Sequence, residues 1–206
     1  MAGMSTSGDP WRQMPVLHGR LVRLEPLSRG HLPDILAAAA ALEALPFAAL
    51  PTPGTAQSWL DAALAALDQE RALPFAVLDR DGALVGSSRF YDIDRSLPKA
   101  SIGYTWYLPG VRGSGVNSEC KLLLLQYAFE VLGCHRIAFE TSTLNTVSRR
   151  ALAAIGAREE GILRRHKRHP DGTLRDTVVF SIIDSEWPDV RERLLARLAR
   201  HGGPQA

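Results

Sequence analysis

The sequence predicts an α/β fold in which helices flank a single mixed, mostly antiparallel central sheet. Strand-like and helix-like segments follow one another in the order β-α-α-β-β-β-α-β-α-β-β-α. Three of these strands are consecutive and joined by short turns, which is typical of an antiparallel meander. A doubly wound dinucleotide-binding fold alternates strand and helix throughout, whereas this chain has one such crossover. The element order therefore favours the mostly antiparallel sheet.

Length and composition indicate one ordinary globular unit. The chain has 206 residues, of which 46% are hydrophobic and 22% charged, enough for one sizeable core. We expect a single domain over residues 1–206, with flexible tails at 1–15 and 202–206. A net charge of +2 is too small to indicate a nucleic-acid partner. We therefore expect no contact with nucleic acid, other than proximity to ribosomal RNA if its partner is a ribosomal protein.

Targeting and metal signals are also weak. The first ten residues lack the basic start and apolar run of a secretory signal. The longest apolar stretch, Ile35–Leu42, is much shorter than the roughly 18 residues of a membrane span. Cys120 and Cys134 lack metal-type spacing and fit a reducing cytoplasm. We expect a cytoplasmic protein that binds no metal and makes no direct membrane contact. We also expect the Cys120 thiol to be buried.

The N-terminal half begins with a strand at residues 20–25, where polar and apolar residues alternate. Two Ala/Leu-rich helices follow at 32–45 and 55–71, separated by a Pro-rich loop. Thr55 or Ser58 is expected to cap the second helix. The meander strands are then predicted at residues 73–78, 84–91 and 101–108.

The C-terminal half begins with a Leu-rich helix from Val116 that ends at Gly133. A strand at 136–141 and a helix at 145–155 come next, followed by a hairpin of strands 157–166 and 173–183. The final helix is expected to begin with Ser185 as its cap. Its apolar face would consist of Trp187, Val190, Leu194 and Leu198.

The loop from Pro109 to Asn117, which joins a strand to the Leu-rich helix, is the most informative segment. Its glycines allow the amides of residues 113–117 to converge, and the helix adds its unpaired N–H groups and positive dipole end. Such a site suits a phosphate or pyrophosphate. A glycine-rich turn without a ligand is the plain alternative.

Two phosphate-binding motifs fit this loop poorly. A P-loop requires Gly-Lys-Ser/Thr at the helix start, and this chain has Gly-Val-Asn. A dinucleotide fingerprint requires a third glycine where Ser118 stands, although Glu140 is the kind of acidic residue that it would use.

A third motif fits better, because Arg112–Asn117 resembles Arg-x-x-Gly-x-Gly/Ala, the coenzyme A pyrophosphate loop of the GNAT superfamily of N-acetyltransferases. Lys99–Ile183, nearly half of the chain, is similar to the Rim-type ribosomal-protein N-terminal acetyltransferases within that superfamily. The matching stretches are Ile102-Gly103-Tyr104, Arg112-Gly113-Ser114-Gly115, Glu119, Tyr127-Ala128-Phe129-Glu130, His135-Arg136-Ile137, Asn145-x-x-Ser148-Arg149, Ile155-Gly156-Ala157, Glu160-Gly161-x-Leu163-Arg164 and Arg175-Asp176. Asn117 departs from the pattern, which prefers Gly or Ala there.

The resemblance implies a GNAT fold and transfer of an acetyl group from acetyl-CoA, as co-substrate, to an amine. It also implies that a strand end parts from its neighbour and leaves backbone groups free for pantetheine. The implied cofactor-binding residues are Trp106, Tyr107, Leu108, Arg112, Gly113, Ser114, Gly115, Val116, Asn117, Asn145 and Ser148. The aromatic side chains on this strand could equally be core residues.

The resemblance implies catalytic roles for a few polar residues. Asn145 would contact the coenzyme and Ser148 would protonate the leaving thiolate, although their spacing also suits a helix cap. The general base remains open among Glu140, Glu119 and Asp92, and a water chain could replace it. Glu119 could instead complement the helix dipole.

The acceptor amine is harder to predict. A protein or peptide N-terminal α-amine is expected, with a small-molecule amine as the alternative and a non-catalytic acyl-CoA-binding module as a different class. The basic run Arg164–His169 precedes a predicted turn, so it is either a solvated hairpin tip or a surface that attracts an acidic partner. The oligomeric state stays open between monomer and homodimer.

Overall fold

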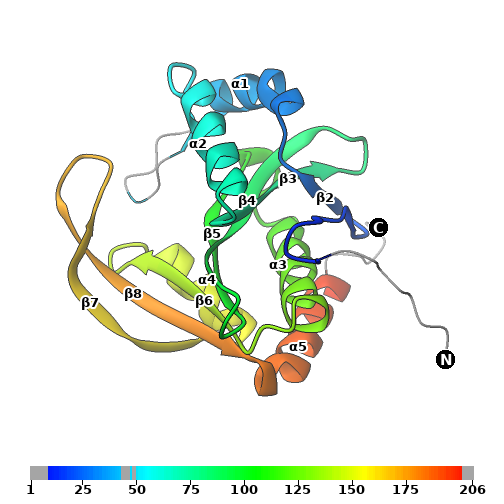
Figure 1. The fold of residues 1–206 in the computed structure, drawn as a ribbon, viewed down its shortest axis with the longest axis vertical. Coiled ribbons are helices and arrows are strands. Elements are labelled where there is room, and N and C mark those ends of the chain that lie inside the picture. The colour runs from blue at the N-terminus through cyan, green and yellow to red at the C-terminus, as the bar shows by residue number, and fades with distance from the viewer. Residues whose placement is uncertain (1–8, 43–46, 48–49, 201–206) are drawn as a thin grey trace.

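The computed structural model of the protein describes residues 9–42, 47 and 50–200, and the residues outside these ranges include both predicted chain ends and the predicted end of the first helix. Within the described ranges, eight strands form one sheet in the order β1-β2-β3-β4-β5-β6-β8-β7 (Figure 1). All neighbours are antiparallel except β5 and β6, which are parallel. The predicted mixed, mostly antiparallel sheet is therefore confirmed.

The elements follow the predicted order, with one strand added at the start. The strands are β1 (Leu17–His18), β2 (Val22–Pro26), β3 (Ala72–Asp79), β4 (Leu84–Asp94), β5 (Lys99–Tyr107), β6 (Arg136–Ser142), β7 (Arg158–Arg168) and β8 (Leu174–Ile183). The α-helices are α1 (Leu32–Ala41), α2 (Ala56–Asp68), α3 (Val116–Gln126), α4 (Thr146–Ile155) and α5 (Trp187–Arg200). A π-helical turn, Tyr127–Val131, continues α3.

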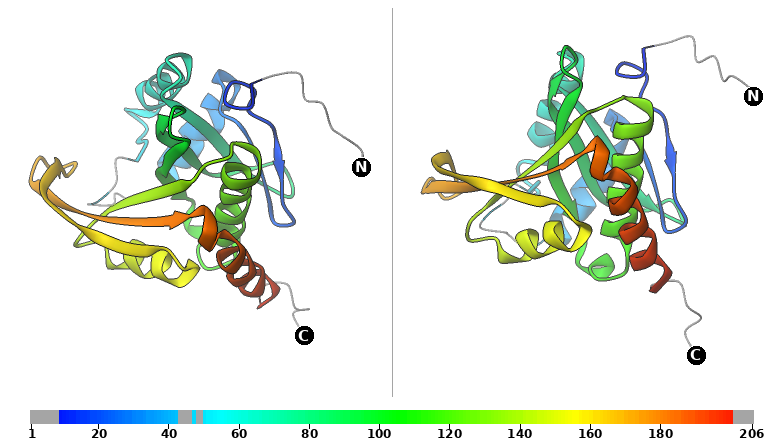
Figure 2. Two further views of the ribbon diagram at one scale, coloured as in Figure 1. Left: turned by 60° about the horizontal axis from the view of Figure 1, so that its bottom comes forward. Right: turned by 90° about the horizontal axis from the view of Figure 1, so that it is seen from below.

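Helices cover both faces of the sheet (Figure 2). One buried cluster joins α1 and α2 to the sheet, and a larger cluster joins α3, α4 and α5 to it. The apolar face predicted for the last helix is confirmed, since Trp187, Val190, Leu194 and Leu198 are all buried. This packing against α3 anchors the helix that follows the glycine-rich loop.

The predicted helix caps are only partly right. Thr55 is the N-cap residue of α2, as predicted, but its hydroxyl contacts Thr52 and caps no helix amide. The Ser58 hydroxyl donates back to the Thr55 carbonyl. Ser185 lies inside a short 3-10 turn, Asp184–Glu186, that precedes α5, and the Glu186 carboxylate accepts from the amide of Ile183 instead.

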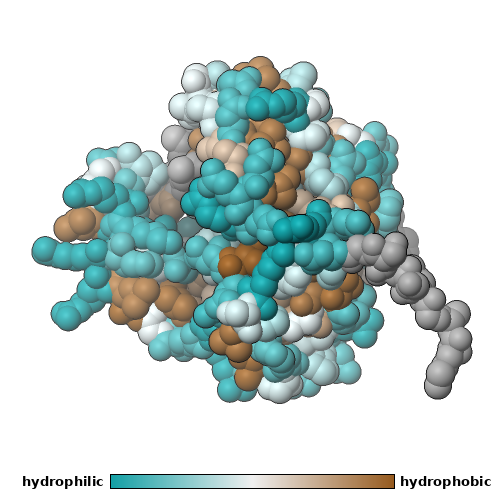
Figure 3. Space-filling view, viewed as in Figure 1, coloured by the Kyte–Doolittle hydropathy of each residue, from teal (hydrophilic) through white to brown (hydrophobic). Residues whose placement is uncertain are grey.

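The β7–β8 hairpin extends away from the rest of the sheet (Figure 1), and hydrophilic side chains project from that side of the molecule (Figure 3). β7 continues to Arg168, two residues beyond the predicted strand end. The prediction of a protruding basic hairpin is confirmed in outline.

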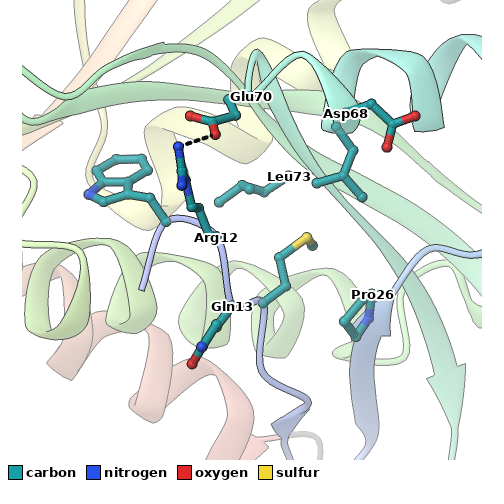
Figure 4. Close-up of a pocket in the computed structure, with 9 residues that line it drawn as sticks. Arg12, Gln13, Pro26, Asp68, Glu70 and Leu73 are labelled. Atoms are coloured by element: carbon teal, nitrogen blue, oxygen red, sulfur yellow. Dashed lines mark ion pairs between the residues drawn. The ribbon is translucent and has the colours of Figure 1, made fainter. Parts of the chain in front are cut away.

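The described part of the predicted N-terminal tail is packed against the protein, which corrects that prediction. Trp11 is buried, and the Tyr127 hydroxyl donates to the carbonyl of Pro10 at 2.6 Å. Arg12 pairs with Glu70 at 2.7 Å across a surface hollow of about 480 Å³ (Figure 4). The hollow is lined by the N-terminal segment, α2 and β3, so it is separate from the glycine-rich loop.

Candidate active site

β5 and β6 pair over only three residues and then separate. The parallel register joins Lys99 to Arg136, continues for two further pairs and ends at Ser101 opposite Ala138. Beyond that point the described sheet gives the facing edge of β5 no strand partner. Backbone groups on such an edge can bind an extended ligand. The strand separation implied by the resemblance is therefore present.

The residues near the end of β5 differ in how far their side chains are buried and in whether their amides are hydrogen-bonded. Trp106 is 4% exposed and packs with α1 and α2, as the core interpretation predicts. Tyr107 is partly buried against the larger cluster. The amide of Leu108 donates to the carbonyl of Val85 at 2.9 Å, so it is not free, which corrects that expectation.

A β-bulge in β5 turns Tyr104 away from the core. Ser87 faces Trp106 and Arg89 faces Gly103, so β5 contains one extra residue between these pairs. Tyr104 has a φ of +52°, which is strained for a residue other than glycine. Its side chain is 55% exposed, so the core interpretation fails for this aromatic residue.

The glycine-rich loop has the backbone that the sequence predicts. Gly113 and Gly115 have φ values of +79° and +93°, a region that favours glycine. Gly115 is the N-cap of α3, and no side chain among the described residues is seen to cap the helix. The first-turn amides of Val116 to Ser118 have no intrahelical partner, so together with the dipole they fit an anionic group.

The departure at Asn117 causes no backbone strain, because this residue lies in the regular first turn of α3. Asn117 is half-buried, whereas Arg112, Gly113 and Ser114 earlier in the loop are exposed. The Ser114 hydroxyl donates to the carbonyl of Val111 at 2.6 Å and so rigidifies the loop.

Glu119 has a structural position that does not suit a general base. Its carboxylate accepts the backbone amides of Arg20, Leu21 and Val22 at 2.9, 2.5 and 2.8 Å. The residue is 4% exposed. Glu119 thus holds the turn between β1 and β2 onto α3, and an acceptor amine has no access to it.

Glu140 lies on β6 beyond the point where β5 separates. Its side chain is 15% exposed and its carboxylate pairs with the Lys167 ammonium of β7 at 2.5 Å. Burial raises the pKa of Tyr91, and the nearby charge of Glu140 raises it further. Asp92, which also raises the pKa of Tyr91, is exposed at the end of β4.

Asn145 and Ser148 are brought together at the start of α4. Asn145 is the N-cap, and its Oδ1 accepts the amide of Ser148 at 3.0 Å, so the capping interpretation of Asn145 is confirmed. The hydroxyl of half-buried Ser148 makes no hydrogen bond with any described residue. It therefore remains available to a ligand. Arg149 pairs with Glu159 at 3.1 Å.

Sequence reasoning missed Lys121, which is buried on α3. Its ammonium donates to Thr105 of β5 at 3.1 Å and lies 5.7 Å from the ring centroid of Phe139 of β6. Burial lowers the pKa of Lys121. The side chain thus contacts both separating strands from the α3 face. A lysine on a helix is ordinarily solvated, so its sequence position gave no signal.

Both cysteines are free and buried, which confirms the prediction for Cys120. Burial raises the pKa of each thiol, to about 12 for Cys134. In the described ranges, no cluster of three or more His, Cys, Asp or Glu side chains could hold a metal ion. None of the described helices is both long and apolar enough to span a membrane.

The separated strands and the glycine-rich loop are the arrangement that the resemblance implies for a coenzyme A site. The family model described as an acetyltransferase (GNAT) domain matches residues 21–158, so the chain belongs to the GNAT acetyltransferase family. The fold implied by the resemblance is thereby confirmed.

Among known proteins, the chain is similar to the Bacillus subtilis (strain 168) protein named "Putative ribosomal N-acetyltransferase YdaF". The two are 34% identical over 107 residues, which cover 52% of this chain and 57% of that protein. The matched segments span less than three-fifths of the first curated relatives. The similarity to Rim-type proteins predicted from the motifs is confirmed.

Solved structures match more of the chain. A GCN5-related N-acetyltransferase from Brucella melitensis has a TM-score of 0.79 and 32% identity, covering 93% of this chain and 87% of that one. RimJ of Mycobacterium smegmatis, solved in complex with CoA-disulfide, has a TM-score of 0.74 and 27% identity, covering 88% and 92%.

Proposed function

We propose that the chain is an acetyl-CoA-dependent N-acetyltransferase that acts in the cytoplasm, with a protein or peptide N-terminal α-amine as its acceptor. The observation that carries the proposal is the separation of β5 from β6 together with an α3 N-terminus that no side chain of the described ranges caps. Membership of the GNAT family and similarity to a protein named as a ribosomal N-acetyltransferase support it.

The residues of the loop and of β5 would hold the co-substrate. When bound, acetyl-CoA supplies an acetyl thioester. The amides of Gly113, Gly115, Val116 and Asn117 would bind its pyrophosphate, whereas the Ser114 amide donates to the carbonyl of Val111. The unpaired edge of β5 near Trp106 and Tyr107 would bind its pantetheine. Asn145 would line the same site next to Ser148.

Glu140 is our proposed general base. The nucleophile must be the neutral amine, and an α-amine with a pKa of about 8 needs little assistance to lose its proton. Among the three carboxylates considered, Glu140 alone lies half-buried on β6 beyond the strand separation. Ser148, whose hydroxyl has no described partner, would give a proton to the departing thiolate.

Ser148→Ala should lower kcat by about 100-fold, the low end of general-acid assistance, because a thiolate is already a fair leaving group. The KM for acetyl-CoA should change little, since the proton is needed only in the transition state. Steady-state kinetics and a melting curve on the same variant test this.

Asn145→Ala is the matched variant, because it removes the cap and leaves the hydroxyl. It should lose about 1 kcal/mol of stability, whereas Ser148→Ala should melt like the parent. Normal kcat in Ser148→Ala would remove the proposed general acid.

A second prediction concerns the basic run Arg164–His169 in the β7–β8 hairpin, and the structure reduces the number of residues in it that could attract an acceptor. Lys167 pairs with Glu140, Arg168 donates to the carbonyl of Gly172 and His169 is buried. Arg164 and Arg165 are therefore the exposed arginines of the run whose side chains have no partner among the described residues. If they attract a macromolecular acceptor, Arg164→Gln/Arg165→Gln should raise KM for a protein acceptor by about 3- to 10-fold at low salt. The KM for a short neutral peptide should be unchanged.

The effect should fade at high salt, because exposed charges are screened over about 10 Å at 0.1 M ionic strength. Arg193→Gln/Arg200→Gln on α5 removes the same charge elsewhere and serves as the control. Equal KM values for the hairpin variant and the parent on the protein at low salt would make the run a solvated tip.

The proposed function is tested by coenzyme A release over a panel of amines at saturating acetyl-CoA. The panel contains peptides with a free α-amine, the same peptides with a blocked α-amine and a lysine, and small polyamines. Release confined to the free α-amine supports the proposal. Turnover with polyamines alone would mean that the acceptor is a small-molecule amine and not an N-terminal α-amine. Binding of acetyl-CoA without coenzyme A release in the presence of any amine would indicate a non-catalytic module.

A further inference from the structure

Arg89 in the middle of β4 is a buried cation that has no counter-ion among the described residues. It is 6% exposed, and its Nε is fully buried without a hydrogen-bond partner. The Arg89 side chain makes no hydrogen bond or ion pair with any residue that the structure describes. A buried guanidinium stays charged, and leaving its N–H groups unpaired is costly, so this arrangement calls for an anionic partner.

Aromatic rings hold the guanidinium in place. Its central carbon lies 4.2 Å from the ring centroid of Tyr104 and 5.3 Å from that of Trp59 on α2. Trp59 in turn meets Trp106 edge-on at 6.1 Å. These faces attract the cation but accept none of its in-plane N–H groups. The rings fix the orientation of Arg89 and leave its hydrogen bonds unmade.

Arg89 is linked to the proposed general base through two tyrosines. Tyr104 is the bulged, exposed residue of β5, and its ring meets Tyr91 edge-on at 5.2 Å. The charge of Glu140 raises the pKa of Tyr91, so the Glu140 carboxylate is near this second tyrosine. The proposed base and the unpaired cation therefore lie around one pair of tyrosines. The coenzyme would be held by other parts of the fold, namely the glycine-rich loop and the start of α3.

We propose that Arg89 binds a carboxylate of the acceptor, so that the preferred substrate is a primary amine that carries a carboxylate near the amine. This inference rests on the proposed function. Two N–H groups of a guanidinium can bind both oxygens of a carboxylate in one plane. Because ring faces flank Arg89, a ligand would have to meet the edge of the guanidinium, and a planar carboxylate fits an edge better than a tetrahedral phosphate does.

The test compares acceptors that differ only in charge. Kinetics are measured with two peptides that begin Ser-Glu and Ser-Gln, and with glycine and glycinamide to separate peptide-borne from free carboxylates. The parent protein should prefer the carboxylate member of a pair by about 10- to 100-fold in kcat/KM, the worth of one charge-assisted contact. Arg89→Gln should reduce that ratio to about one.

Two further variants keep the result interpretable. Arg89→Lys retains the charge but not the planar pair of donors, so its ratio should be intermediate. It also decides the matter if Arg89→Gln fails to fold. Arg71→Gln, which removes an exposed arginine near the end of α2, should keep the parent ratio. A parent ratio near one, or an unchanged ratio in Arg89→Gln, would overturn the inference.

Calorimetry separates this inference from the proposed function. The Ser-Glu and Ser-Gln peptides are titrated into the protein loaded with coenzyme A, which needs no turnover. Tighter binding of Ser-Glu by about tenfold in the parent but not in Arg89→Gln supports the inference even if neither peptide is acetylated. Acetylation of both peptides with equal affinities would sink the inference and leave the proposed function standing.

Discussion

Gly115→Val is expected to abolish the thermal stabilisation that coenzyme A gives the parent protein. A ligand at 100 times its Kd stabilises the folded state by about 2.7 kcal/mol. Gly115 has a φ of +93° at the N-cap of α3, a conformation that a β-branched residue tolerates poorly. Relief of that strain would move the amides of the loop, so the Kd for coenzyme A should rise at least about 100-fold. NAD should stabilise neither protein.

Gly172→Val is the matched control. Gly172 lies in the β7–β8 turn with a φ of +84°, and a Cβ there would meet nothing within 4 Å. Both substitutions introduce similar backbone strain, of about 1–3 kcal/mol, so both proteins should melt earlier without ligand. Only Gly172→Val should keep the shift with coenzyme A. A full shift in Gly115→Val would place the pyrophosphate elsewhere.

Glu119→Ala is expected to destabilise the protein by about 3–5 kcal/mol, because it leaves three backbone amides at the β1–β2 turn without their acceptor. For a protein of this size, that corresponds to a fall in Tm of about 6–20 °C. Well below the new Tm, kcat should stay within about threefold of the parent. Urea unfolding and kinetics at low temperature measure both quantities.

Glu192→Ala, which removes an exposed carboxylate from α5, controls for the change in net charge and should leave stability nearly unchanged. The opposite pattern for Glu119→Ala, an unchanged Tm with a collapse of kcat, would restore Glu119 as the base. It would also imply that the three backbone contacts contribute little to the fold.

Features that depend on local sequence could be predicted. The positive φ of Gly113 and Gly115 follows from a glycine-rich turn before a helix, and the Asn145 cap follows from its position three residues before Ser148. The apolar stripe of α5 likewise identified its buried face. Each of these signals is contained in one segment of chain.

Features that depend on distant contacts could not be predicted. Glu119 meets its three amides across about a hundred residues of chain, and nothing near it in the sequence marks them. The bulge at Tyr104 is a mismatch between two strands, visible only in their register. Arginine and lysine are usually exposed, so nothing in the sequence indicates that Arg89 and Lys121 are buried. Their burial results from the packing of the helices on the sheet.

The measurement that tests the account most directly is the site of acetylation on one peptide that has both a free α-amine and an internal lysine. The protein, acetyl-CoA and this peptide are incubated together, and tandem mass spectrometry locates the added acetyl group while free coenzyme A is quantified. We expect one acetyl group per peptide, on the α-amine, with an equal amount of coenzyme A released. Binding of acetyl-CoA with neither amine acetylated, or acetylation of the lysine alone, would contradict it.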